Sequence, residues 1–230
     1  VAKTFTMGTR LLTRKNFAVG AVALFVVFAS LLSQRIGRDR LAVDVLDIGQ
    51  GDAIFITTPS GERVLLDGGP DASVVAKLSR RLGFFNRTID LVIATHPQAD
   101  HITGLLSVFD RFTVKRVMLT TIRNETPEYR ALREKIAEKG IALTDIATTP
   151  HVDFGETRGV ALDVLWPDRS YSGRLVDDPN IVSAVFRLTY GETRFLFTGD
   201  AGHEIEEQLL DAGVDLRADV LKVGHHVSDT

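Results

Sequence analysis

The chain has 230 residues, of which 44% are hydrophobic, so it is long enough for one globular domain with a full core. Its formal net charge is −3, whereas a domain held to nucleic acid by charge alone is expected to be basic. The lack of cysteine excludes disulfides, zinc–thiolate sites and a cysteine nucleophile.

The N-terminal part contains an uncharged apolar run at residues 17–32, FAVGAVALFVVFASLL, with basic residues on both sides. The run is apolar on all faces, and its length is near the lower limit for crossing a bilayer, about 17 residues. We therefore expect a single transmembrane signal anchor at residues 17–33, after a tail at 1–16 and before a linker at 34–40. A cleaved signal peptide and a buried core helix are the alternatives. The basic tail favours a cytoplasmic N-terminus, which would place the following domain outside the cytoplasm, at the cell membrane.

Residues 41–230 alternate between predicted strands and predicted helices. The strands are expected at Leu41–Ile48, Ala53–Thr58, Arg63–Leu66, Ile89–Ala94, Val114–Leu119, Val160–Leu165, Ser183–Tyr190, Thr193–Phe197 and Asp219–Val223. The helices are expected at Ala72–Leu82, Thr103–Asp110, Pro127–Lys139 and His203–Ala212, with Thr126 as the cap of the third. Early antiparallel strands followed by strand–helix alternation indicate an α/β sandwich with sheets inside and helices outside.

Four loops that directly follow predicted strands carry aspartate or histidine. These residues are Asp67 in LLDGG, His96, Asp100 and His101 in THPQADH, Asp200 in FTGD, and His225 and His226 in KVGHH. Such loops can converge at one edge of the sheet layers. Imidazoles and carboxylates together suit zinc, manganese or iron, so the pattern predicts a metal site.

Each of these residues alone has a simpler interpretation. A strand-end aspartate is usually a helix cap or turn residue, and a lone histidine is usually an ordinary surface or core residue. We interpret His151 and His203 in this way, and Gln50 and Asp52 of GQGDA as turn residues. However, four of the six histidines lie within two of the strand-exit motifs, which favours the metal site.

The motifs DIGQGDA, LLDGG, THPQADH, NIVS, FTGD and KVGHH, in this order, resemble the metallo-β-lactamase superfamily. Within it they are most similar to the ComEC-type hydrolase domain of DNA internalisation-related competence proteins. The resemblance runs from about Leu41 to Thr230 and implies an αββα sandwich with hydrolase activity. Members normally continue past the last motif with another helix and strand, so one expectation is a C-terminally truncated domain.

The resemblance also implies roles for individual residues. The implied metal ligands are His96, Asp100, His101, Asp200 and His226, with Asp200 matching a carboxylate that bridges two metals. Asp67 matches a buried acid that orients a ligand, and His225 is left to contact the substrate or the leaving group. With Asp100, which would help to hold the attacking hydroxide, these two residues form the expected catalytic set.

Two positions depart from the superfamily pattern H-x-H-x-D-H and its later histidine. Gln98 stands in place of the second histidine of the motif, and Asn180 stands where other members carry a further histidine ligand. ComEC-type sequences share the asparagine and often lack the second histidine. We therefore expect one tightly bound divalent metal, zinc or manganese, and a second, weak site.

The function implied by the resemblance is phosphodiester hydrolysis by a metal-bound hydroxide outside the cytoplasm. The substrate would be DNA or another phosphodiester, and the partners would be the membrane and the DNA-uptake machinery. One alternative is hydrolysis of small phosphoesters of the phosphocholine type, or of lactones. Another is a binding module whose metal site has decayed.

Overall fold

The structure is a computed structural model that describes residues 19–22, 24–25, 28, 40–83, 86–154 and 159–224. The chain divides into two compact units, Val1–Arg40 and Leu41–Thr230. In the first unit, residues 19–22, 24–25 and 28 are helical and their side chains are exposed. Within the described ranges, no helix combines the length and apolar character needed to span a bilayer. Most of the predicted anchor lies outside the described residues, so the transmembrane helix stays a prediction.

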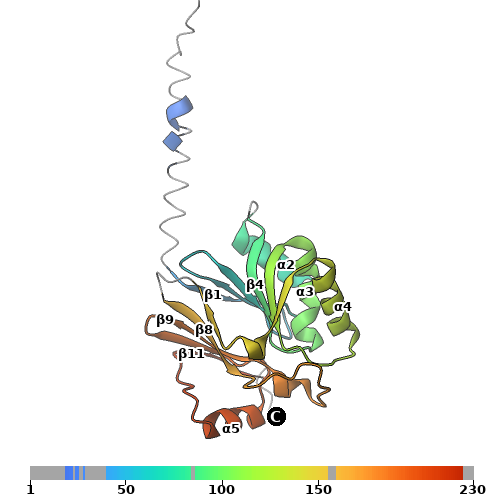
Figure 1. The fold of residues 1–230 in the computed structure, drawn as a ribbon. Coiled ribbons are helices and arrows are strands. Elements are labelled where there is room, and N and C mark those ends of the chain that lie inside the picture. Colours follow the sequence, from blue (N-terminus) through green and yellow to red (C-terminus); the bar gives the residue numbers. More distant parts are fainter. Residues whose placement is uncertain are drawn as a thin grey trace, which may run out of the picture. The chain divides into compact units, whose positions relative to one another are not determined.

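Six strands of the second unit form one mixed sheet. They are β1 (Ala42–Val45), β2 (Ile54–Thr57), β3 (Arg63–Leu66), β4 (Thr88–Ala94), β5 (Thr113–Leu119) and β6 (Ala142–Asp145), and they lie in this order across the sheet. The first three strands pair antiparallel and β3 to β6 pair parallel. The parallel strands are connected by three helices, α2 (Ser73–Leu82), α3 (Ala99–Arg111) and α4 (Pro127–Glu138) (Figure 1).

The other five strands form a second sheet. They are β7 (His151–Asp153), β8 (Val160–Trp166), β9 (Val185–Tyr190), β10 (Thr193–Phe197) and β11 (Val220–Lys222), in the spatial order β11-β10-β9-β8-β7. Only the pairing of β10 with β11 is parallel among these described strands. The helix α5 (His203–Asp211) connects these two strands, and short 3₁₀ helices η1 (Ile146–Thr148) and η2 (Pro179–Val182) lie in the connecting segments.

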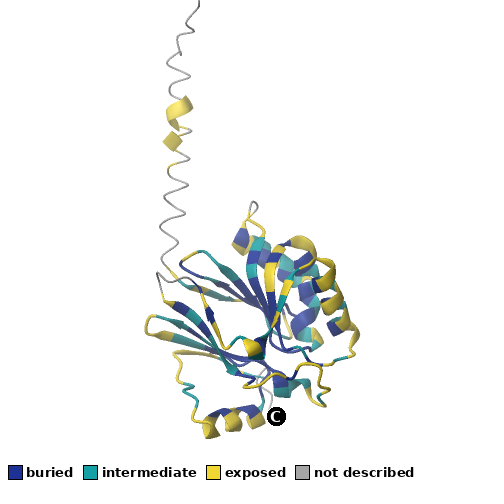
Figure 2. Ribbon diagram, viewed as in Figure 1, coloured by how far each residue is buried: buried dark blue, intermediate teal, exposed yellow. Residues whose placement is uncertain are grey.

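Strand β4 explains why the two sheets stack, because its side chains are buried on both faces (Figure 2). Ile89 and Val92 pack in a cluster with the helices, whereas Leu91 and Ile93 pack in a cluster shared with the second sheet. A third cluster places Ile205 of α5 on the other face of the second sheet. The layers are therefore helices, sheet, sheet and helix, which confirms the predicted α/β sandwich.

Most predicted elements are present, including the cap of α4, where the Thr126 side chain accepts a hydrogen bond from the backbone N–H of Tyr129. Two differences affect the picture of the fold. Helix α3 begins at Ala99 rather than Thr103, so Asp100 and His101 lie in its first turn and not in a loop. Strands β6 and β7 were not predicted, because both are short and show few buried side chains.

Helix α3 lies directly against the loop that follows β3. The N–H of Gly104 donates to the carbonyl of Gly69 at 2.9 Å, and the N–H of Gly68 donates to the carbonyl of His101 at 2.7 Å. A Cβ atom on Gly104 would lie only 1.9 Å from the carbonyl oxygen of Gly68. The contact therefore requires glycine, and it holds the end of β3 against the first turn of α3.

Replacement of Gly104 by alanine should destabilise the domain. Alanine in a helix normally adds about 1 kcal/mol relative to glycine. Here the added methyl group meets backbone, and such overpacking costs about 1–3 kcal/mol beyond that gain. Urea unfolding should show this loss, whereas Gly202→Ala, at the N-cap of α5 and with open space around it, should cost only the preference for glycine over alanine at an N-cap, about 0.5–1 kcal/mol. Equal or greater stability of Gly104→Ala would contradict the contact.

Candidate metal centre

The chain brings three potential metal ligands together at the ends of its strands. His96 lies just beyond the C-terminal end of β4, His101 lies in the first turn of α3, and Asp200 follows β10 of the second sheet. All three are buried, and their ligand atoms lie within 4.8 Å of one another. The end of β4 and the first turn of α3 thus meet the loop that follows β10 of the second sheet.

The ligand atoms of these residues face a common point. His101 Nε2 lies 3.3 Å and His96 Nε2 lies 4.0 Å from Asp200 Oδ2, and the two ring centroids are 4.1 Å apart. Two imidazole nitrogens and a carboxylate oxygen form the donor set that zinc takes in hydrolases, and manganese accepts the same atoms. The residues therefore fit a bound divalent metal.

Asp67 orients one of these histidines from behind. It is buried and has a left-handed backbone, with φ at 55°, directly after β3. One carboxylate oxygen accepts a hydrogen bond from the N–H of Thr95 at 2.8 Å. The other oxygen accepts from the Thr95 hydroxyl at 2.7 Å and bonds His101 Nδ1 at 2.8 Å. With its proton on Nδ1, His101 presents Nε2 to Asp200, as a ligand-orienting acid should arrange.

Thr95 fixes the second histidine in the same way. The hydroxyl of Thr95 donates its hydrogen bond to Asp67, so its oxygen accepts one from Nδ1 of His96, which lies 2.9 Å away. In a metal complex, Nε2 of His96 would offer its lone pair on the side of Asp200. Gln98 Oε1 lies 3.1 Å from this nitrogen, so the residue that replaces the superfamily's second histidine also points at the centre.

The two histidines differ in charge. Burial, together with the neighbouring His101, lowers the pKa of His96 to about 4, so the ring is neutral at pH 7. Burial alone would also lower the pKa of His101, but the carboxylates of Asp67 and Asp200 outweigh it and raise that pKa to about 10. Since a metal-bound imidazole is neutral, binding at His101 must release a proton.

A lysine next to the centre was not among the predicted site residues. Lys222, at the end of β11, forms an ion pair with Asp52, and its Nζ lies 3.8 Å from Asp200 Oδ1. Asp52 itself lies 4.0 Å from His101 Nδ1, and burial raises its pKa against the opposing effect of Lys222. The sequence offered a signal, since both residues lie in motifs singled out above, but it did not show that the two motifs meet.

Ser183 is a second residue that sequence reasoning missed. Its hydroxyl oxygen accepts a hydrogen bond from the N–H of Asp200 at 2.8 Å and lies 3.3 Å from His96 Nδ1. The serine thereby ties the Asp200 loop to His96. Ser183 is the last residue of the NIVS motif. The motif therefore supplies a hydrogen-bonding serine next to the metal ligands His96 and Asp200.

Four other predicted residues are not part of this described group. Asp100 is half-buried in the first turn of α3 and does not belong to the group formed by His96, His101 and Asp200. Asn180 lies in η2, where its buried Oδ1 has no hydrogen-bond partner among the described residues. His225 and His226 lie outside the described residues. The roles of these four residues therefore stay predictions.

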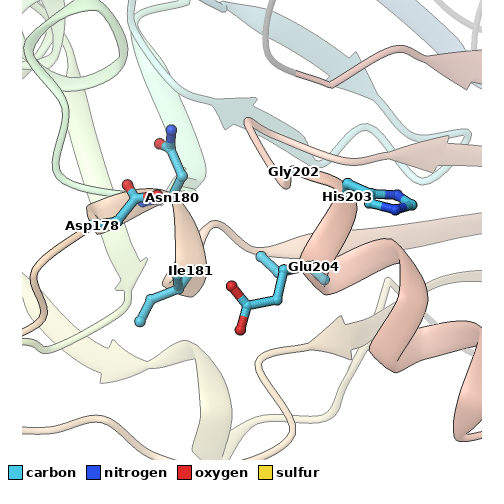
Figure 3. A pocket seen from close by; sticks show the side chains of 7 residues that line it. Asp178, Asn180, Ile181, Gly202, His203 and Glu204 are labelled. Carbon is cyan, nitrogen blue, oxygen red and sulfur yellow. The ribbon is translucent and has the colours of Figure 1, made fainter. Parts of the chain in front are cut away.

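Asn180 lines a cavity of about 340 Å³ between η2 and the start of α5. Figure 3 shows Asp178, Asn180 and Ile181 on one side of this cavity and the first residues of α5, including His203 and Glu204, on the other. The cavity is therefore bounded by carboxylates and by an amide oxygen.

The geometry defines a four-layer α/β protein with a histidine–aspartate metal centre at its strand ends. Residues 46–230 match the sequence profile of the metallo-beta-lactamase superfamily. This chain belongs to that superfamily, as the motif order predicted.

Known relatives add a narrower similarity. The chain is 28% identical over 206 residues to ComE operon protein 3 of Bacillus subtilis, with coverage of 81% of this chain and 25% of that protein. It is 27% identical over 212 residues to competence protein ComA of Neisseria gonorrhoeae, with coverage of 91% and 27%. It is also 26% identical over 166 residues to ribonuclease Z of Aeropyrum pernix, with coverage of 64% and 50%. The chain thus spans about a quarter of the length of these competence relatives, and the predicted resemblance to competence proteins is confirmed.

The Asp67→Asn change should weaken metal binding. The amide offers one acceptor oxygen in place of two, and its NH2 group must face a donor of Thr95 or His101, so the orientation of His101 is weakened and a buried donor is left without a partner. Loss of such a supporting group typically lowers metal affinity about 10–100-fold. Titration of the metal-free protein with zinc, followed by calorimetry, measures the change. The matched variant Asp71→Asn, at the exposed start of α2, should bind zinc as the wild type does.

Proposed function

We propose that this chain is a metal-dependent phosphodiesterase that cleaves DNA or a related phosphodiester. The observation that carries the proposal is the convergence of His96, His101 and Asp200 at one buried point, with Asp67 set behind them. The superfamily supports hydrolysis in general. The similarity to two competence proteins and to a protein named ribonuclease Z supports a nucleic acid substrate.

The residues divide the work of such a reaction. A divalent metal, when bound, activates water for attack and neutralises charge on the phosphate. His96 and His101 would hold it through Nε2, and Asp200 would complete the described part of the ligand set. Asp67 and Thr95 keep both rings in the orientation that ligation needs. Because the centre is buried, its groups interact in a medium of lower polarity than water.

The proposal extends to the location of the domain. The described helical residues of the first unit include Val22, Leu24 and Phe25, whose apolar side chains are exposed. Such a helix is suited to a membrane anchor, and the basic tail before it favours an extracytoplasmic hydrolase domain. A membrane-bound enzyme in this position would meet DNA during uptake, so the uptake machinery is the proposed partner.

The topology can be tested with reporter fusions. Alkaline phosphatase joined after residue 230 should be active, because that reporter folds only after export. A fluorescent reporter that requires the cytoplasm should be dark at the same position. The opposite pair of results would reverse the proposed orientation.

The nuclease proposal predicts a clear effect of Asp200→Ala. The change removes the only carboxylate of the described ligand group, so the divalent metal content should fall. The rate of hydrolysis should drop by about 100-fold or more, because the loss of a group that stabilises transition-state charge typically lowers the rate by that factor. Circular dichroism should be unchanged. The assay uses labelled single- and double-stranded DNA with manganese or zinc, and Asp163→Ala, on the outer face of the second sheet, is the control. Full activity of Asp200→Ala would contradict the metal assignment.

A second candidate substrate is a small ester with a cationic group, such as phosphocholine. The carboxylates of Asp178 and Glu204 at the cavity beside Asn180 favour a positively charged group there. The same protein preparation should be given p-nitrophenyl phosphocholine next to DNA. Faster cleavage of the choline ester, reduced by Glu204→Gln, would support this candidate over the nuclease.

A further inference from the structure

We propose that the ammonium group of Lys222 takes the place that a second metal ion would have in a two-metal centre, so that this site binds a single divalent ion tightly. The inference concerns the metal centre and does not depend on which ester the enzyme cleaves. It rests on three observations about Asp200, Asp52 and Lys222.

The first observation is the way Asp200 is shared. Its Oδ2 lies 3.3 Å from His101 Nε2 and 4.0 Å from His96 Nε2, on the side where a metal would bind. Its Oδ1 lies 3.8 Å from the ammonium nitrogen of Lys222. One carboxylate thus spans a metal-ligand group on one side and a fixed cation on the other. The ammonium group of Lys222 thus lies next to the oxygen of Asp200 that is not paired with the histidines.

The second observation is that Lys222 pairs with a member of a second group of potential metal ligands. The described residues contain another set of ligand atoms within 4.8 Å of one another, from Asp52, Asp67 and His101. Lys222 forms its ion pair with Asp52, a member of that set. The charge that a second ion would neutralise is therefore already paired with the ammonium group.

The third observation is that Lys222 is held in place. Its Nζ donates to the carbonyl of Gly199 at 2.8 Å, and the side chains of Lys222 and Asp52 are only 14% and 12% exposed. A nearly buried charge pair is weakly screened by solvent and salt. The lysine is thus a lasting part of the centre rather than a surface residue that happens to lie near it.

The balance of charge leads to the same conclusion. Asp52, Asp67 and Asp200 contribute three negative charges around the neutral histidines of a metal-bound centre. Lys222 and one divalent ion together match these three charges. A second divalent ion on this side of Asp200 would have to lie close to the buried ammonium group, which is unfavourable.

The test compares Lys222→Met with Lys222→Arg in metal-free full-length protein, titrated with manganese by isothermal calorimetry. The wild type should bind one ion tightly. Lys222→Met should bind that ion about tenfold more tightly or take up a second ion, because a nearby positive charge has been removed. Lys222→Arg keeps the charge and should bind like the wild type. Lys115→Met removes a lysine from an exposed ion pair near the start of β5 and should have no effect.

Two further variants separate charge from structural damage. Asp52→Asn removes one negative charge beside the centre and leaves the charge of Lys222 in place, so the ion should bind about tenfold more weakly. The double variant Asp52→Asn with Lys222→Met restores the charge balance and should return affinity close to that of the wild type. This double variant also keeps the test informative if Lys222→Met does not fold.

Thermal melting gives a readout that needs neither substrate nor activity. Without metal, Lys222→Met should melt at a lower temperature than the wild type. Manganese should raise the melting temperature of Lys222→Met by more than it raises that of the wild type. Two tightly bound ions in the wild type would overturn the proposal, as would unchanged affinity and stoichiometry in Lys222→Met. Failure of the nuclease assay alone would affect the proposed function and not this inference.

Discussion

The arrangement of the whole centre depends on one buried carboxylate. Asp67 accepts three hydrogen bonds, two from Thr95 and one from His101, and so connects β3, β4 and α3 at a single point. Its left-handed backbone is held because the N–H of Asp67 donates to the carbonyl of Ile93, and the glycines after it meet α3 closely. A buried charge with this many donors is stable, whereas the same charge without them would not be. The hydrogen bonds of Asp67 therefore fix the positions of His101 and, through Thr95, of His96.

Much of the fold was predictable because its pattern is local. The continuous apolar run of β4 and the capping threonine of α4 identify their elements without any knowledge of neighbours. The start of α3 was not predictable in this way. The extended backbone of Gln98 lets the helix begin four residues earlier than the apolar spacing indicated, and this moves Asp100 and His101 into a helix. Strands β6 and β7 depend on neighbouring strands rather than on their own sequence.

The residues of the candidate site likewise divide into those that a local motif predicts and those that only the tertiary structure brings together. His96, His101, Asp67 and Asp200 follow strands in recognisable motifs, and the structure brings them together. Asp52 and Lys222 also lie in such motifs, at opposite ends of the domain sequence, but their ion pair forms only because the two sheets stack. Pairing across distant segments is set by tertiary packing, so a turn residue was the natural interpretation of Asp52. Ser183 was missed for the same reason, since its partners lie on another loop.

The two sheets contribute unequal parts of the centre, and this has a consequence for how metal affinity is set. The first sheet and α3 supply the two histidines with Asp67, which form a unit joined by hydrogen bonds. The second sheet supplies Asp200 and Lys222, which reach that unit through packing, ion pairs and the hydrogen bonds of Ser183. The apolar layer between the sheets, with Leu91, Ile93 and Phe186 at its centre, therefore fixes the distance between the histidines and the carboxylate. Since buried layers are close-packed and resist small displacements, the core acts as a positioning element for the chemistry at its edge.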